Sequence, residues 1–392
     1  MSRPIAFTVG IVALLTASGV HATPGADRFK QLHEELPTPN EVRLASGAPG
    51  PAYWQQRADY DIELTLDDAA QRIDARETIV YTNASPHDLD YLWIQLDQNS
   101  FRRGSDREKL GWLPDFTEFP YRTLRTYLAR EKFEGGVTLN RVEVGRKPAK
   151  YTVVGTMMRI DLEEPLRTGR KARIDIAWTH NINNAKAIRG RGGYEEFDDG
   201  HRIYTIAQWF PRMAAYNDVD GWQNKQFLGR GEFTLELGDY RVAIRVPTDH
   251  VVAATGVLQN AKDVLSAVER ERLDAAITSD TPVLIVTEDE AVAASKEASK
   301  AYQTWRFEAE NVRDFAFATS RRFMWDAMGV DNGDERVLCM SYYPKEAAPL
   351  WTRYSSPAIA HTIEVYGRLT FPYPYPVSIS INGPVGGMEY PM

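Results

Sequence analysis

The sequence predicts a mainly β fold built from large antiparallel sheets, followed by the opening of a smaller α/β region. Apolar and polar residues alternate strictly over residues 60–66, which is typical of a strand with one buried face. The same period of two returns at residues 174–178, 233–237 and 242–246. A helical spacing of apolar residues takes over only near the end of the chain, after about residue 355.

The first 22 residues have the composition of a secretory signal peptide. Arg3 precedes an apolar run at residues 5–20, and Val20-His21-Ala22 is a plausible cleavage site. We expect export to a bacterial periplasm or to the medium, with an uncleaved anchor as the alternative. The apolar run is shorter than the roughly 20 residues that a spanning helix needs, so we expect no stable membrane span after cleavage. Residues 23–50 follow as a lead-in segment ending in Gly and Pro.

Residues 51–320 are expected to form one large β domain. Many alternating strands with polar outer faces favour antiparallel sheets over a parallel βαβ core. The sequence "LGDY" at residues 237–240 lies between two of the expected strands and predicts a hairpin turn. A short helix is expected near residues 264–277.

Residues 321–392 are expected to begin a second domain. Ser356-Pro357 predicts a helix N-cap and first turn, and the helix that follows carries His361 as a surface or packing residue. The prolines of "FPYPYP" at 371–376 require an extended chain. We expect a strand at 377–381, a loop at 382–387, and an edge strand at 388–392.

Composition limits the partners. The formal net charge of −8 argues against nucleic acid or an anionic membrane as the main partner. Nine Trp and 19 Tyr are expected to fill β-sheet cores, with carbohydrate stacking as the alternative. Cys339 is the single cysteine, so no intrachain disulfide can form, and its apolar neighbours predict a buried thiol on a strand.

The sequence contains no recognisable catalytic metal site. None of its seven histidines lies four residues from another, so the H-E-x-x-H pattern that places two zinc ligands on one helix face is absent. "HEELP" at 33–37 begins like that pattern but ends in proline. A G-x-S-x-G nucleophile motif is also missing.

Glu389 lies on the expected edge strand, after the glycine pair of the preceding loop. Strand edges bind peptides by adding them as a further strand. A carboxylate at the end of such a groove would pair with the α-ammonium group of a peptide, which is how an exopeptidase recognises a chain terminus. A solvated surface charge is the plainer interpretation of the same residue.

The ending "GGMEYPM" resembles the G-x-M-E-N exopeptidase motif of the M1 family of zinc aminopeptidases, in the bacterial variant that has Tyr after Glu. Further stretches resemble that family in order and spacing: "AQWFPRMAAYNDVDGW", "GRGEFTLELGDYRVAIRVP", "AATGVL", "FEAENVRDFAFATS" and "FPYPYPVSISINGPVGGMEYPM". The resemblance implies a saddle-like N-terminal β domain and then a thermolysin-like domain beginning near Arg321.

The resemblance also implies roles for individual residues. Glu389 corresponds to the carboxylate that binds the free amino terminus of the substrate, and Gln208 corresponds to a glutamine of the same pocket. Tyr390 replaces the usual Asn, which bears on the contacts along the strand edge. The loop backbone that lines the substrate corresponds to Gly386, Gly387 and Met388.

In this family the zinc ligands and the general-base glutamate lie downstream of that motif. We therefore expect the N-terminal portion of a secreted zinc aminopeptidase, which removes N-terminal residues from peptides. This chain would bind peptide amino termini but would lack the zinc site and be inactive alone. The alternative is a non-catalytic peptide-binding or scaffold protein built on the same β domain.

Overall fold

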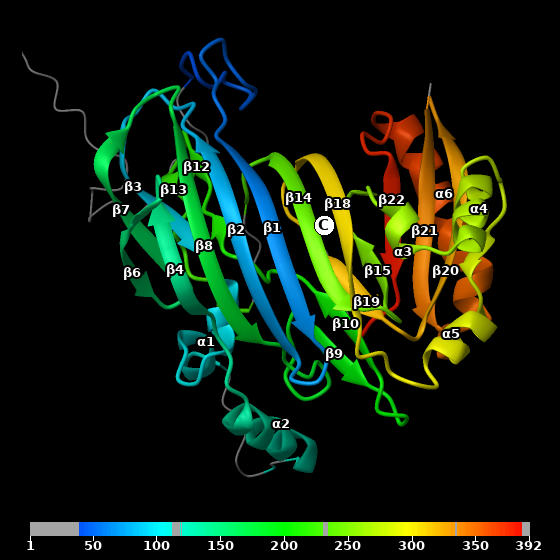
Figure 1. Ribbon diagram of the computed structural model, residues 1–392. Helices are drawn as coiled ribbons and strands as arrows, with labels where there is room; N and C mark the ends of the chain where they lie inside the picture. The colour runs from blue at the N-terminus through cyan, green and yellow to red at the C-terminus, as the bar shows by residue number, and fades with distance from the viewer. Residues whose placement is uncertain (1–38, 112–117, 119, 230–233, 334, 386–392) are drawn as a thin grey trace, which may run out of the picture. The chain divides into compact units, whose positions relative to one another are not determined.

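The computed structural model describes residues 39–111, 118, 120–229, 234–333 and 335–385 (Figure 1). The chain divides into two compact units, residues 1–53 (unit 1) and residues 54–392 (unit 2). The described part of unit 1 is a looped segment in which Arg43 forms an antiparallel bridge with Pro49. The predicted signal peptide and the predicted strand at 388–392 lie outside the described residues. The domain boundary at 320/321 stays a prediction.

Unit 2 contains an eight-stranded sheet in which only the β1–β14 pair is parallel. Across the sheet its strands are β16 (Val257–Leu258), β18 (Tyr302–Val312), β14 (Gly238–Pro247), β1 (Arg57–Asp67), β2 (Arg72–Thr82), β8 (Lys171–Asn181), β4 (Thr138–Val144) and β5 (Lys147–Pro148). Alternate residues of β1 are buried, from Ala58 to Leu66, because successive side chains of a strand point to opposite faces. The strand predicted at 60–66 is therefore confirmed.

Two four-stranded sheets and one short ribbon share a continuous apolar core with this large sheet. One contains β11 (Arg212–Met213), β3 (Leu89–Gln95), β7 (Met157–Leu166) and β6 (Lys150–Val154). The other contains β15 (Val251–Ala254), β19 (Phe317–Ser320), β10 (Arg202–Ile206) and β9 (Gly193–Glu196), and the ribbon pairs β12 (Tyr216–Asn217) with β13 (Gly221–Trp222). The rings of Trp178 on β8 and Trp209 after β10 lie 6.1 Å apart between their centroids and join the layers.

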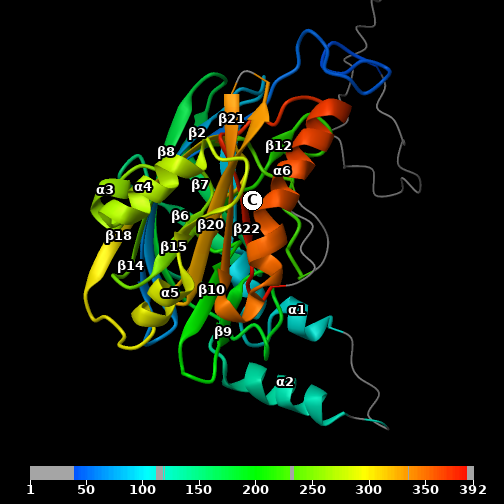
Figure 2. The same ribbon diagram turned by 90° about the vertical axis from the view of Figure 1, so that its right-hand side faces the viewer.

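A further four-stranded sheet has the order β17 (Val283–Val286), β20 (Phe323–Asn332), β21 (Glu335–Pro344) and β22 (Val377–Ile381). Figure 2 shows α6 (Leu350–Leu369) on one face of this sheet and α4 (Ala267–Ala276) and α5 (Glu288–Ala294) on the other. Ser266 caps α4 and Thr287 caps α5. In each cap the side chain accepts a hydrogen bond from the backbone N–H of the glutamate three residues later, and that glutamate side chain accepts one from the backbone N–H of the cap residue. The remaining helices are α1 (Asp106–Lys109), α2 (Tyr121–Lys132), α3 (Ala261–Val264) and the 3₁₀ helices η1 (Asp97–Phe101) and η2 (Lys345–Ala347).

The chain is mainly β, as predicted, and most of its strand pairs are antiparallel. The helix expected near 264–277 and the strands expected at 174–178, 242–246 and 377–381 are also confirmed. A second parallel pair joins β21 to β22, which fits the expected α/β character of the last region.

The predicted hairpin turn at 237–240 is wrong. β14 begins at Gly238 and runs without a turn to Pro247, and Leu237 forms only an isolated bridge with Arg57. Residues 234–236 form no strand, so the strand expected at 233–237 is not found there. The glycine serves a close approach instead, because a Cβ on Gly238 would lie 1.6 Å from the carbonyl oxygen of Ala58.

The predicted helix start at Ser356-Pro357 is also wrong. α6 begins at Leu350, and Pro357 lies inside it. Ser356 is fully buried, and its hydroxyl donates a hydrogen bond to Asp326 on β20. A proline within a helix removes one hydrogen bond, here to the carbonyl of Arg353, and the packing of α6 on the sheet offsets that loss.

Glu77 on β2 is a buried acid whose carboxylate oxygens have no hydrogen-bond partner among the described residues. Burial raises its pKa well above the ordinary value of 4.5, so the folded protein keeps Glu77 protonated while the unfolded chain ionises. Stability is therefore lost as the pH rises from 4.5 toward the folded-state pKa.

We expect Glu77→Met to increase the free energy of unfolding by about 1–3 kcal/mol at pH 8. The Met side chain has a similar shape and has no carboxyl group that lacks a hydrogen-bond partner. The gain should shrink as the pH falls to 4.5 and below, because Glu77 of the unfolded wild type then also becomes protonated. Urea unfolding at both pH values tests this, with Glu63→Met on the exposed face of β1 as the control. A gain that is equal at the two pH values would contradict the account.

Candidate functional site

Gln208 lies in the segment that joins β10 to β11. Its φ of +52° is in the left-handed region, which a residue other than glycine rarely adopts. The residue is 4% exposed, and its carbonyl oxygen accepts a hydrogen bond of 3.0 Å from the side-chain amide of Gln98. Its own Nε2 is buried and has no hydrogen-bond partner among the described residues. Unusual backbone and an unsatisfied buried amide together are typical of a functional position.

Arg212, four residues further on, fixes this segment. Its guanidinium donates to Asp97 at the start of η1 and to Asp314 before β19, and the side chains of these residues are 1%, 2% and 1% exposed, respectively. We call these three residues the Arg212 triad. Burial raises the pKa of Asp314 above its ordinary value, and the positive charge of Arg212 opposes that rise.

Two further hydrogen bonds tie the same segment to other elements. The indole Nε1 of Trp209 donates to the carbonyl oxygen of Phe315 over 3.0 Å. The backbone N–H of Met213 donates to the hydroxyl of Tyr60 on β1 over 2.9 Å. These hydrogen bonds and the ion pairs of Arg212 thus hold the segment that contains Gln208 in one backbone conformation.

The loop after β22 lies against the strand that leads to Gln208. The backbone N–H of Asn382 donates to the carbonyl oxygen of Tyr342 over 2.8 Å, which continues the ladder with β21. A Cβ placed on Gly383 would lie 2.2 Å from Oγ1 of Thr205 on β10. That hydroxyl is buried and has no hydrogen-bond partner among the described residues. The structure therefore brings the residues that precede the terminal motif next to β10.

Of the residues predicted to bind substrate, only Gln208 is among those described. The others lie outside the described residues and stay predictions: Gly386, Gly387, Met388, Glu389 and Tyr390.

Sequence reasoning missed three residues of this region: Thr205, Arg212 and Gly383. Only Arg212 had a usable signal, because a charged residue inside the apolar run "AQWFPRMAA" must find buried partners.

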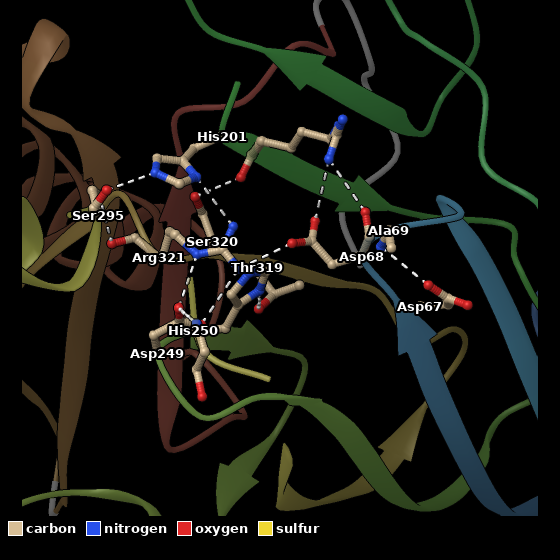
Figure 3. Close-up of polar contacts among 12 residues, drawn as sticks. Asp67, Asp68, Ala69, His201, Asp249, His250, Ser295, Thr319, Ser320 and Arg321 are labelled. Atoms are coloured by element: carbon tan, nitrogen blue, oxygen red, sulfur yellow. Dashed lines mark hydrogen bonds and ion pairs between the residues drawn. The ribbon is translucent and has the colours of Figure 1, made fainter. Parts of the chain in front are cut away.

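A second buried polar group surrounds Arg321, which follows β19 (Figure 3). Arg321 is paired with Asp68 and with Asp249, each at 3.0 Å. The Nε2 of His201 lies 2.6 Å from the carbonyl oxygen of Ser295 and must donate to it. The other ring nitrogen, Nδ1, then accepts from Arg321 at 3.3 Å.

His250 completes this arrangement, which we call the Arg321 cluster: Arg321, Asp68, Asp249, His201 and His250. The hydroxyl of Thr319 donates to the carbonyl oxygen of Val251, so Nδ1 of His250 donates to Thr319 over 3.1 Å. Burial lowers the pKa of His250 to about 4, and the charge of Arg321 adds to the effect. Arg321 and His250 are 3% and 1% exposed, and the cluster ties the chain after β19 to the turn after β1 and to the turn before β15.

Four smaller findings concern metals, membranes, the single thiol and a surface histidine. Within residues 39–385, gaps excepted, no group of three or more His, Cys, Asp or Glu side chains could hold a metal ion. Over the same described residues, no helix is long and apolar enough to cross a membrane. Cys339 is fully buried on β21, as predicted, and burial raises its pKa to about 12. His361 lies on the exposed surface of α6, 4.0 Å from Glu364.

An open apolar groove of about 880 Å³ runs between α6, residues 371–374 and β22. α6 contributes Trp351, Tyr354 and Ile359, and the hydroxyl residues Ser378 and Ser380 of β22 lie on the opposite wall.

No protein-family model matches the chain, and no curated protein matches it. Among solved structures, it is similar to an M1 zinc metallopeptidase from Deinococcus radiodurans, with 13% identity and a TM-score of 0.48. The match covers 87% of this chain and 59% of the other, so the chain spans about three fifths of that structure's length. A structure of a two-domain M1 zinc metallopeptidase bound to L-tryptophan matches with 12% identity, 87% and 60% coverage and a TM-score of 0.48. One from Deinococcus radiodurans bound to a Tyr-Ser-Ala substrate has 13% identity, 85% and 58% coverage and the same TM-score of 0.48.

We expect Arg212→Leu to lower the free energy of unfolding by about 3–5 kcal/mol, because it leaves two buried carboxylates without their cation. Urea unfolding measures the change. Arg76→Leu is the matched control, since Arg76 pairs with Glu63 on the surface and should cost less than about 1 kcal/mol. Equal losses for the two variants would show that the Arg212 triad does not stabilise this segment.

We also expect a pH dependence from His250. Its pKa is about 4 in the folded protein and 6.5 ordinarily, so the unfolded chain takes up a proton first as the pH falls. The contribution to stability is complete above pH 6.5 and is lost as the pH falls toward 4. Between pH 7 and pH 5 the loss should be roughly 1–2 kcal/mol.

His250→Asn should reduce this loss, because Asn keeps a donor for Thr319 and does not titrate. Unfolding measured at pH 7 and pH 5 in the wild type and the variant gives the two differences. The prediction fails if the variant loses as much stability as the wild type.

Proposed function

We propose that this chain is the N-terminal portion of an exported M1-type zinc aminopeptidase, and that Gln208 helps to bind the free amino terminus of a peptide. The observation that carries the proposal is the buried side-chain amide of Gln208, which has an unsatisfied end at a backbone position with φ of +52°. A turn of this amide exchanges its nitrogen and oxygen, and the oxygen would accept a hydrogen bond from an α-ammonium group.

The contact between Gly383 and Thr205 supports the proposal. Gly383, shortly before the terminal motif, lies beside Thr205 of β10. Thr205 is three residues before Gln208 in the sequence. Glu389 would then supply the carboxylate of the pocket, and a charge-assisted hydrogen bond with that carboxylate would carry most of the recognition. The neutral amide of Gln208 would add direction to the contact without adding charge.

We assign the hydrolytic step to another part of the enzyme, because the resemblance of the motifs implies that the zinc ligands of the family lie downstream of residues 386–390. We propose that the chain binds peptides and is inactive alone. The resemblance of its motifs to the M1 family supports zinc as the cofactor of the whole enzyme.

A non-catalytic peptide-binding protein is the second candidate. β22 is the last strand of its sheet, so its outer edge has no neighbouring strand among the described residues. An extended peptide could add to that edge without any metal. Binding that is tight in the presence of a chelator, together with no turnover when zinc is added, favours this candidate.

The test compares a short peptide with its N-acetylated form by isothermal titration calorimetry. We expect tighter binding of the free amine, and we expect Gln208→Ala to weaken that binding by about 10-fold, since a hydrogen bond to a charged group is lost. The affinity for the acetylated peptide should not change. Gln259→Ala, at an exposed position after β16, is the control.

Equal affinity for the free and acetylated peptides would overturn the proposed role of the site. Robust hydrolysis of an aminoacyl anilide by this chain with added zinc would overturn the proposal that it is inactive alone.

A further inference from the structure

α2 (Tyr121–Lys132) stands away from the sheets of unit 2. Figures 1 and 2 both show it beyond the end of the sheets, next to α1. Among the described residues no other helix or strand makes an extensive contact with it, and none of its described side chains is buried. A helix of 12 residues is only marginally stable in water, so α2 needs a surface that covers its apolar side.

The apolar side of α2 consists of Tyr121, Leu124 and Leu128. These residues are three and four positions apart, so their side chains lie on one face of the helix. They are 75%, 39% and 52% exposed, which is unusual for three large apolar residues in a row along a helix. An exposed stripe of this kind marks a surface that binds something.

The rest of α2 is basic. The helix contains four Arg or Lys residues and one Glu, whereas the whole chain has a net charge of −8. Arg125, Arg130 and Lys132 form no ion pair with an acidic side chain among the described residues. The positive charges of Arg125 and Lys132, four residues after Tyr121 and Leu128, therefore remain uncompensated beside the apolar stripe.

Neighbouring arginines increase this charge. Burial lowers the pKa of Arg107 on α1 to about 10, and repulsion from Arg130 adds to the shift. Arg103 donates to the carbonyl oxygen of Glu131 in the last turn of α2, so a further guanidinium lies at this end of the helix. The arrangement favours an anionic partner.

We propose that α2 binds the surface of an anionic phospholipid bilayer. The helix lies parallel to the surface, with Tyr121, Leu124 and Leu128 among the upper acyl chains and Arg125 and Lys132, which border that stripe, beside lipid phosphates. An anionic lipid surface suits this helix because basic side chains lie next to an exposed apolar stripe, and lipid headgroups and acyl chains complement these two features. The negative charge of the remaining chain keeps other regions away from the lipid, so contact is confined to the projecting helix. The inference is independent of the proposed peptide site.

The experiment uses the full chain with large unilamellar vesicles of phosphatidylcholine alone or with phosphatidylglycerol at a ratio of 3:1. Co-sedimentation should show at least about 10-fold stronger binding to the anionic vesicles at low salt, and weaker binding at high salt. Residues 5–20 are apolar and could bind vesicles themselves, so a local measurement is needed. Hydrogen–deuterium exchange of residues 121–132 should slow on anionic vesicles.

Two variants test the two faces of α2. Replacement of Arg125 and Lys132 by Gln should weaken binding roughly 30-fold, from about 1 kcal/mol per charge. Leu124→Glu with Leu128→Glu should abolish the exchange protection in α2. Val268→Glu, at a position on α4 that is 49% exposed, is the matched control and should bind like the wild type. All variants should unfold at the wild-type temperature, because α2 contributes no core residue.

The proposal is overturned if vesicle-bound chain shows unchanged exchange in α2, or if the charge variant binds anionic vesicles as tightly as the wild type. It is also overturned if soluble poly-glutamate binds α2 while vesicles do not, since the partner is then an acidic polypeptide.

Discussion

The Arg212 triad is the interaction on which the arrangement of unit 2 depends. One guanidinium joins Asp97 and Asp314, which are 115 and 102 residues away in the sequence, inside an apolar core. Three charges can be buried only where each is paired, so β11, η1 and the chain before β19 have a single compatible arrangement. The positions of Gln208, of Trp209 in the core and of the chain that leads to α1 and α2 all follow from it.

The two buried arginine groups act on the same short strand. Asp314 of the Arg212 triad precedes β19, and Arg321 follows it, while all four residues of β19 are buried. β19 pairs with β10 on one side and β15 on the other. A strand of four residues would be weakly held by its ladder alone, and ion pairs at both ends supply the missing restraint. β10, the strand that leads to Gln208, therefore pairs with a strand that is held at both ends.

The local sequence pattern was sufficient to predict the strands in which buried and exposed residues alternate. The alternation that predicted β1, β8 and β14 reflects one buried face per strand, and the apolar neighbours of Cys339 reflect its place inside β21. Gly238 was misinterpreted as part of a turn because the backbone it approaches belongs to Ala58, far away in the sequence. Gln208 was predicted as a site residue from resemblance to a family, whereas its contact with Gln98 and the approach of Gly383 to Thr205 are long-range features that no local pattern contains.

The parallel pairing of β1 with β14 also has a consequence for the order in which the protein can fold. Tyr60 is paired with Tyr240, so β1 has no partner on that side until the chain has been synthesised to the end of β14 at Pro247. At roughly 5–20 residues per second, β1 waits on the order of 10–40 s after its own synthesis. During that interval the strand exposes an unpaired edge and the apolar face that later forms the core. Binding of a chaperone to the nascent chain is therefore most useful before β14 emerges.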